Sequence, residues 1–143
     1  MYKNTSKLRA NSFGFYALNG NSAIDFKEHS KKEDVCEFLG TVKAKNPEKR
    51  IIIILDNFAS HRANDTKLYA EKNGIELVFL PPYSPDLNPI EFIWKSIKRV
   101  VSRNFVVDLD HMKELIYKSF LEFSSKISFA KRWIEKFLSG KHV

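Results

Sequence analysis

The stretch that decides the fold is I-I-I-I-L-D-N-F-A-S-H-R-A-N-D-T-K-L-Y-A-E-K-N-G-I-E-L-V-F-L, residues 51–80. Its unbroken apolar run, Ile51 to Leu55, contains four β-branched isoleucines and suits a strand covered on both faces, as in the middle of an α/β sheet. The segment from about Ala59 to Asn73 is predicted to be a helix, with Asn73-Gly74 as its C-cap. Ile75 to Leu80 is predicted to be a second buried strand. Strand, helix and strand in this order predict a βαβ unit with parallel strands.

The segments on either side of this unit also carry recognisable patterns. Two apolar runs, Phe13 to Leu18 and Ser22 to Phe26, flank Asn19-Gly20, which predicts a hairpin with a type I′ turn. An amphipathic helix is predicted from about Lys31 to Ala44, where Asn46-Pro47 ends it. Three further helices are predicted near residues 89–103, 110–123 and 127–138. The first of these has an apolar stripe made of Ile90, Ile93, Trp94, Ile97 and Val101. One α/β domain over residues 1–143, with a helical C-terminal cap, is the predicted organisation.

The charge of the chain is unevenly distributed. The 143 residues include one cysteine and carry a formal net charge of +7. Residues 91–143 hold 11 Lys+Arg against 6 Asp+Glu, a net charge of +5. A basic C-terminal third indicates a polyanionic partner, most often nucleic acid, although a solvated Lys-rich surface is the simpler alternative. Because no apolar run is long enough for a signal peptide or a membrane span, we expect a soluble intracellular protein.

Two carboxylates stand out by their position. Asp56 follows the predicted strand at its carboxyl end, where open α/β sheets bind ligands. Glu91 lies in the first turn of the helix that follows a Pro-rich loop. Carboxylate oxygens suit Mg²⁺ or Mn²⁺, and paired ions of this kind support phosphoryl transfer. Local features alone favour a simpler alternative, in which Asp56 caps the next helix and Glu91 completes a capping box with Asn88.

Two motifs make the sequence recognisable. L-D-N-F-A-S-H, residues 55–61, followed by L-P-P-Y-S-P-D-L-N-P-I-E-F-I-W-K, residues 80–95, strongly resembles the catalytic domain of DDE transposases. The nearest group is the mariner-type elements and their prokaryotic insertion-sequence relatives. Asp56 and Glu91 are separated by 34 residues, like the second and third acidic residues of the family's triad. The resemblance therefore favours the catalytic interpretation of both carboxylates over the capping one.

The resemblance implies a fold, a reaction and a set of site residues. The fold would be ribonuclease H-like, as in retroviral integrases: a mixed sheet flanked by helices. The reaction would be DNA transposition, in which two Mg²⁺ or Mn²⁺ ions assist phosphodiester hydrolysis and strand transfer. Asp56 and Glu91 would be catalytic and bind the metals, with Asn57 and His61 in support. Lys95, Lys98 and Arg99 share a helix face with Glu91 and would contact DNA phosphates. Trp94 would pack in the core beneath that helix, and Tyr83 with its neighbouring prolines would fix the helix angle.

The sequence also departs from the family's pattern. The family's first catalytic Asp lies on a strand upstream of the hairpin, whereas residues 1–24 contain no Asp or Glu. Asp25 is the first carboxylate, but it falls on the hairpin's second strand. The DNA-recognition domains of the family are also missing. We therefore interpret the chain as an N-terminally truncated catalytic domain that is inactive alone. The alternatives are a non-catalytic DNA-binding or assembly module, or a basic α/β domain with no nucleic-acid role.

The expected partners and assembly follow from this interpretation. The partners would be the DNA of element ends and target, in a prokaryotic cytoplasm at the nucleoid. The missing first strand is central in the family's sheet, so its absence would leave two unpaired strand edges. We expect that the sheet closes up, that residues 1–10 fill the gap, or that a second copy donates a strand. A symmetric dimer is the preferred outcome.

Overall fold

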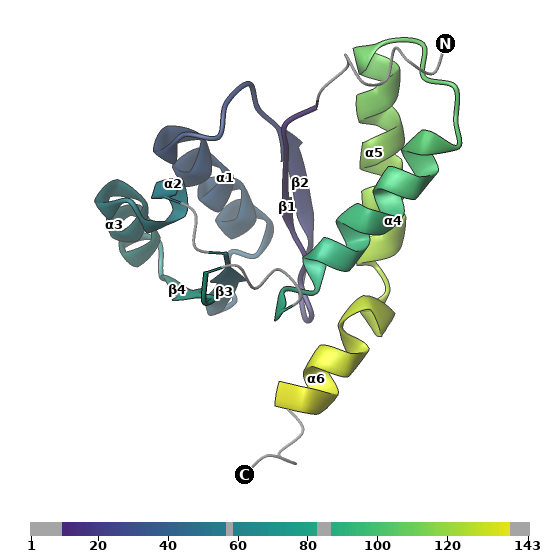
Figure 1. Cartoon of the computed structure of the whole chain (residues 1–143). Helices are drawn as coiled ribbons and strands as arrows, with labels where there is room; N and C mark the ends of the chain where they lie inside the picture. The colour runs from purple at the N-terminus through teal and green to yellow at the C-terminus, as the bar shows by residue number, and fades with distance from the viewer. Residues whose placement is uncertain (1–9, 57–58, 83–86, 138–143) are drawn as a thin grey trace.

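The computed structural model describes residues 10–56, 59–82 and 87–137, and it arranges them as a mixed α/β fold (Figure 1). The elements, in chain order, are β1 (Ser12–Phe15), β2 (Ala23–Phe26), α1 (Lys32–Lys45), β3 (Ile51–Leu55), α2 (Ala59–Arg62), α3 (Asn64–Lys72), β4 (Ile75–Phe79), α4 (Ile90–Ser102), α5 (Leu109–Ser124), the 3₁₀ helix η3 (Ile127–Ala130) and α6 (Lys131–Phe137). Among these described helices, none has the length and apolar character needed to cross a membrane.

Strands β1 and β2 form the predicted antiparallel hairpin, but its turn differs from the prediction. Pairing stops where Phe15 lies opposite Ala23, so the two-residue type I′ turn predicted at Asn19-Gly20 is wrong. The reason is a tertiary contact that the local sequence does not reveal. The buried Asn46, just after α1, accepts a hydrogen bond from the backbone N–H of Asn21 through its Oδ1 at 2.8 Å. The hairpin therefore ends in a wider loop that is tied to the C-terminal end of α1.

The predicted βαβ unit is confirmed. Strands β3 and β4 are parallel, with Ile51 opposite Ile75 and Leu55 opposite Phe79. The single helix predicted between them is divided into α2 and α3 at Ala63, whose extended ψ of 145° interrupts the helical backbone. Gly74 then takes a left-handed φ of +68°, as the predicted C-cap requires.

The prediction that this sheet is covered on both faces is wrong. Helices α1 and α3 pack against one face of β3 and β4, where Ile51 and Ile75 are buried. Successive side chains of a strand point to opposite faces, so Ile52 and Val78 belong to the other side. Ile52 is 52% exposed and Val78 is 43% exposed. A continuous apolar run therefore formed a strand with one buried face, and the opposite face is left partly open.

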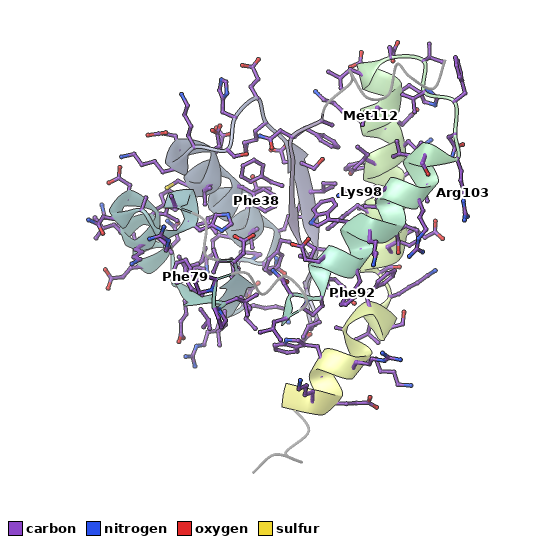
Figure 2. All side chains as sticks on the ribbon, in the orientation of Figure 1. Phe38, Phe79, Phe92, Lys98, Arg103 and Met112 are labelled. Atoms are coloured by element: carbon purple, nitrogen blue, oxygen red, sulfur yellow. The ribbon has the colours of Figure 1, made fainter. Side chains whose placement is uncertain are left out.

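The β1–β2 hairpin lies between two apolar cores. Figure 1 shows α1, α2 and α3 on one side of the hairpin, and α4 with α5 on the other. On the first side, the ring of Phe38, labelled in Figure 2, lies 5.7 Å from that of Phe13. On the second side, Trp94 packs on Phe120 with ring centroids 5.5 Å apart, which confirms its predicted place in the core. The predicted apolar stripe of α4 is also confirmed, with Ile93 and Ile97 fully buried.

The strands form two separate two-stranded sheets, β1–β2 and β3–β4. The expectation that the sheet closes up is therefore wrong, because β1 and β3 are not paired. The suggestion that residues 1–10 fill the gap lies outside the described residues, apart from Ala10. Donation of a strand by a second copy stays a prediction.

The close approach of β1 to α4 gives a test of the second core. A Cβ added at Gly14 would lie 2.5 Å from Cζ2 of Trp94 and 3.1 Å from Cε1 of Phe120. We expect Gly14→Ala to lower the free energy of unfolding by about 1–3 kcal/mol, as overpacking does in a filled core. Denaturant unfolding of G14A, W94F and the double variant would measure it. Because phenylalanine has a smaller ring than tryptophan, G14A should lower the free energy of unfolding less in the W94F background than in the parent. Purely additive losses of stability would contradict this packing.

Candidate active site

Asp56 is placed by the end of strand β3. The carbonyl of Leu55 accepts the last hydrogen bond from β4, donated by the N–H of Leu80 at 2.8 Å. Asp56 follows directly, so its side chain lies at the carboxyl edge of the sheet. His61 of α2 lies beside it, with Nδ1 2.8 Å from Oδ1 of Asp56 and 3.3 Å from its backbone carbonyl oxygen. The structure thus brings together Asp56 and His61, two of the residues that the sequence singles out.

One oxygen of this carboxylate has an unusual environment. Oδ1 of Asp56 is buried, although the side chain as a whole is 44% exposed, and among the described residues it contacts Nδ1 of His61 at 2.8 Å. Burial of a carboxylate oxygen is unfavourable unless a donor or a cation replaces its lost hydration, and His61 is placed to supply part of that replacement. A carboxylate oxygen is the kind of ligand atom that a hard divalent cation prefers.

Glu91 lies in the first turn of α4, half-buried. The capping box considered from the sequence is not formed: Pro89 occupies the N-cap position, and no side chain caps this helix end. The pKa of Glu91 is raised, first by burial and then by the negative charge of Asp56, while Lys98 acts in the opposite direction. The two carboxylates are therefore close enough to repel each other.

A single cavity of about 750 Å³ connects these groups. Asp56, His61 and Glu91 are among the residues that line it, and Trp94 and Trp133 contribute aromatic side chains. Trp133 comes from α6 and was not anticipated, because a lone Trp in a short amphipathic helix carries no local signal of a cavity. The cavity is large enough for several water molecules, each of which occupies about 30 Å³ in the liquid.

The basic residues predicted to contact DNA lie on the same helix as Glu91. Lys95, Lys98 and Arg99 are all exposed on α4. Figure 2 labels Lys98 on this helix. Its positive charge acts on the carboxyl group of Glu91 and partly offsets the rise in the pKa of that group. Asn57 and Tyr83 fall outside the described residues.

The residues present fit a divalent cation only in part. Asp56 and Glu91 supply two carboxylates, and the buried Oδ1 of Asp56 lies beside His61. Within residues 10–56, 59–82 and 87–137, no group of three or more His, Cys, Asp or Glu residues could hold a metal ion. Asp25 is not among the residues that line the cavity, and its carboxylate pairs with Lys27 at 3.1 Å. A cation here would keep much of its hydration shell.

A scan against protein-family models matches residues 1–113 to the family described as DDE superfamily endonuclease. Among curated proteins, a 57-residue segment is 30% identical to an insertion element IS630 uncharacterized 39 kDa protein of Shigella sonnei. A 46-residue segment is 44% identical to the transposable element Tc3 transposase of Caenorhabditis elegans. These segments are 39% and 32% of this chain, but only 17% and 14% of the relatives' lengths.

Solved structures of the Mos1 transposase have a similar fold. The Mos1 strand transfer complex matches with a TM-score of 0.69 and 18% identity, covering 89% of this chain and 39% of that one. The Mos1 catalytic domain, determined with raltegravir and Mg, matches with a TM-score of 0.62 and 18% identity, covering 89% and 75%. At this identity the likeness shows the fold alone, and that fold is ribonuclease H-like, as expected from the sequence.

The raised pKa of Glu91 predicts a pH-dependent stability. A carboxyl group whose pKa is higher in the folded state lowers stability as pH rises from its unfolded pKa through its folded pKa. In EDTA, Glu91→Gln should therefore be more stable than the parent at pH 7, by less than about 1 kcal/mol because the group is half-exposed. Below the unfolded pKa, near pH 4, the gain should vanish. Thermal unfolding across pH 3.5–8 measures this.

The control variant is Glu114→Gln, an exposed residue that pairs with Lys118 on α5. It should change stability by no more than about 0.5 kcal/mol at any pH, and in the destabilising direction. Identical pH slopes for E91Q and the parent would contradict the burial and repulsion described for Glu91.

Proposed function

The chain belongs to the DDE superfamily endonucleases, and from that premise we propose that it is the metal-binding part of a DNA transposase catalytic domain. In the full-length protein this domain would hydrolyse a DNA phosphodiester bond and transfer the freed strand to target DNA. Asp56 and Glu91 would be the catalytic carboxylates. The observation that carries the proposal is the buried Oδ1 of Asp56, which shares a cavity with a carboxyl group whose pKa is raised.

Each residue has a role that its environment supports. Asp56 and Glu91 would hold Mg²⁺ or Mn²⁺; when bound, such ions stabilise the charge on the reacting phosphoryl oxygens. His61 orients Asp56 through the 2.8 Å contact to Oδ1, and Asn57 would assist it. Lys95, Lys98 and Arg99 would bind phosphates along α4 and hold the DNA beside the cavity. Two relatives support a metal-dependent transposase: one is the Tc3 transposase, and the Mos1 catalytic domain was determined with Mg.

We propose that the isolated chain does not catalyse the reaction. Two carboxylates bind Mg²⁺ weakly because the ion gives up its water ligands reluctantly. The second candidate function is therefore a non-catalytic DNA-binding or assembly module. It is favoured by the exposed basic residues of α4 together with the lack of a third acidic ligand among the described residues. In either role the partner would be DNA, the assembly a homodimer, and the place of action a prokaryotic cytoplasm at the nucleoid.

Metal binding tests the role of Asp56. Isothermal titration of the chain with Mn²⁺ or Mg²⁺ should give a Kd of about 1 mM or weaker. Asp56→Asn should remove this binding, because it replaces a carboxylate that lines the cavity with a neutral amide. The matched control, Asp65→Asn, changes an exposed carboxylate that pairs with Lys32. Tight metal binding, or metal binding that D56N leaves intact and D65N removes, would contradict the proposed role of Asp56.

DNA binding tests the role of α4. The double variant Lys98→Ala/Arg99→Ala should lower affinity for unrelated duplexes about equally and flatten the salt dependence by about one or two units. The reason is that phosphate contacts release counterions but carry no base information. Lys43→Ala/Lys45→Ala removes the same charge from α1 and should change the slope less. Fluorescence anisotropy at several salt concentrations measures both; equal slopes for the two pairs would place the DNA elsewhere.

A further inference from the structure

Strand β4 has an outer edge with which no other described strand pairs. The carbonyl of Leu55 in β3 accepts a hydrogen bond from the N–H of Leu80 at 2.8 Å, so the backbone groups of Leu80 point toward β3. In a strand, the N–H and C=O of one residue point to the same side, and the side alternates along the chain. The backbone groups of Ile75, Leu77 and Phe79 therefore point away from β3. Figure 1 shows β4 on the side of β3 that faces away from the β1–β2 hairpin.

We propose that this outer edge binds the same edge of a second copy of the chain. The two β4 strands run antiparallel around a two-fold axis at Leu77, the middle residue of the strand. Leu77 then lies opposite Leu77 of the second copy, and Ile75 lies opposite its Phe79. About six backbone hydrogen bonds join the two strands, because each of these opposing pairs exchanges two. The proposal goes beyond the proposed function by giving the homodimer an interface, and it does not depend on the metal or DNA assignments.

The outer edge lacks the features that usually prevent such pairing. Natural edge strands carry proline, lysine, a bulge or an inward-pointing charge. The sequence of β4 is I-E-L-V-F, in which the only charged residue is Glu76. The carboxylate of Glu76 pairs with Arg50 at 3.1 Å, so the strand presents no unbalanced charge of its own. The next proline, Pro81, lies beyond the strand, and the pairing with β3 runs without a bulge.

A groove beside β4 gives the second copy room to approach. Its volume is about 440 Å³, so α3 does not cover the whole of the strand. The residues that line the groove include Ile75, Leu77 and Phe79 of β4 together with Lys67, Ala70 and Glu71 of α3. Apolar side chains of the second copy that enter the groove become buried against those of β4, which stabilises the pair of strands.

The charges on α3 decide which partner fits. Lys67 lies beside the end of β4, with Nζ 5.7 Å from the ring centroid of Phe79, which Figure 2 labels. Glu71, one helical turn later, lies toward the start of β4, because α3 ends at Lys72 and β4 begins at Ile75. On the α3 side, the groove is therefore positive at one end and negative at the other.

A second copy presents the opposite charge pattern in the antiparallel arrangement. Its strand start lies against the strand end of the first copy, so its Glu71 meets Lys67, and the reverse contact forms by symmetry. Opposite charges placed in this way favour one partner and one register over others. Antiparallel pairing also places Val78 opposite Glu76 of the other copy, so no like charges oppose each other directly. The chain is therefore complementary to itself at this edge.

The joined sheet has the strand order β3–β4–β4–β3. Asp56 follows β3 in each copy, and the two β3 strands run in opposite directions. A strand spacing of about 4.8 Å and a rise of about 3.3 Å per residue place the two Asp56 residues about 25 Å apart, at opposite ends of the joined sheet. On the proposed function, the dimer therefore carries two separate candidate active sites, each built by one chain.

The first experiment exchanges the charges on α3, where Lys67 and Glu71 are both exposed. Sedimentation velocity of the whole 143-residue chain, in EDTA and without DNA, should show a reversible dimer with a Kd of about 10 μM. Lys67→Glu or Glu71→Lys alone creates repulsion at both symmetric contacts and should weaken dimerisation about tenfold or more. The double variant K67E/E71K restores opposite charges and should return the Kd to within about threefold of the parent value.

The matched control exchanges an ion pair of the same spacing on α5, Glu114 with Lys118. The single and double variants of this pair should change the Kd by no more than about twofold. A chain that stays monomeric at about 100 μM, or a dimer on which the α3 and α5 exchanges have equal effects, would overturn the proposal. Because neither DNA nor metal is present, this outcome is independent of the metal and DNA tests of the proposed function.

The second experiment tests the register in a Cys36→Ser background, because Cys36 is the only cysteine of the chain. A residue on a two-fold axis meets its own copy, and the Cα atoms of a hydrogen-bonded pair lie about 5.5 Å apart, within the range of a disulfide. Leu77→Cys should therefore form a covalent dimer on mild oxidation, seen by non-reducing electrophoresis. Val78→Cys is the more exposed control and should form it less. Equal or greater cross-linking by V78C would overturn the proposal.

Discussion

The structure depends on one strand, β1, whose alternate side chains serve two different cores. Phe13 points toward α1 and contacts Phe38, while Gly14 gives room for Trp94 of α4. Because neighbouring residues of a strand point to opposite faces, this hairpin joins the α1 side of the molecule to the α4 side. The position of Glu91 relative to Asp56 follows from it, since one is carried by α4 and the other follows β3.

The candidate active site brings together two carboxylates whose negative charges are only partly balanced. Asp56 has a buried oxygen that His61 contacts, and Glu91 is both partly dehydrated and repelled by Asp56. Two neighbouring carboxylates repel each other, and a positive charge beside them relieves that repulsion. Lys98 supplies part of that charge from α4. Unfavourable electrostatic interactions between side chains that line a cavity are typical of sites that serve binding or catalysis.

Most elements were predictable because their patterns are local. The apolar stripe of α4, the β-branched run of β3 and the Gly74 cap each reflect contacts or backbone preferences within a few residues. The errors share a different cause. The hairpin turn was changed by Asn46, which is distant in sequence, and the exposure of Ile52 depends on which helices cover the sheet. Asp56 and Glu91 stand out by their places at a strand end and a helix start, and the family motif favours a catalytic role for them, whereas the approach of Trp133 to the cavity had no sequence signal.

The separation of β1–β2 from β3–β4 has a consequence for how the chain folds. No backbone hydrogen-bond ladder connects the two described sheets, so side-chain packing through α1 carries the cooperativity between them. Each sheet is built from segments that are near in sequence, with residues 16–22 closing the hairpin and residues 56–74 linking β3 to β4. The contact order within each half is therefore low, which favours rapid formation of two partly independent folding units. Their amide protons should exchange with solvent as two groups rather than one.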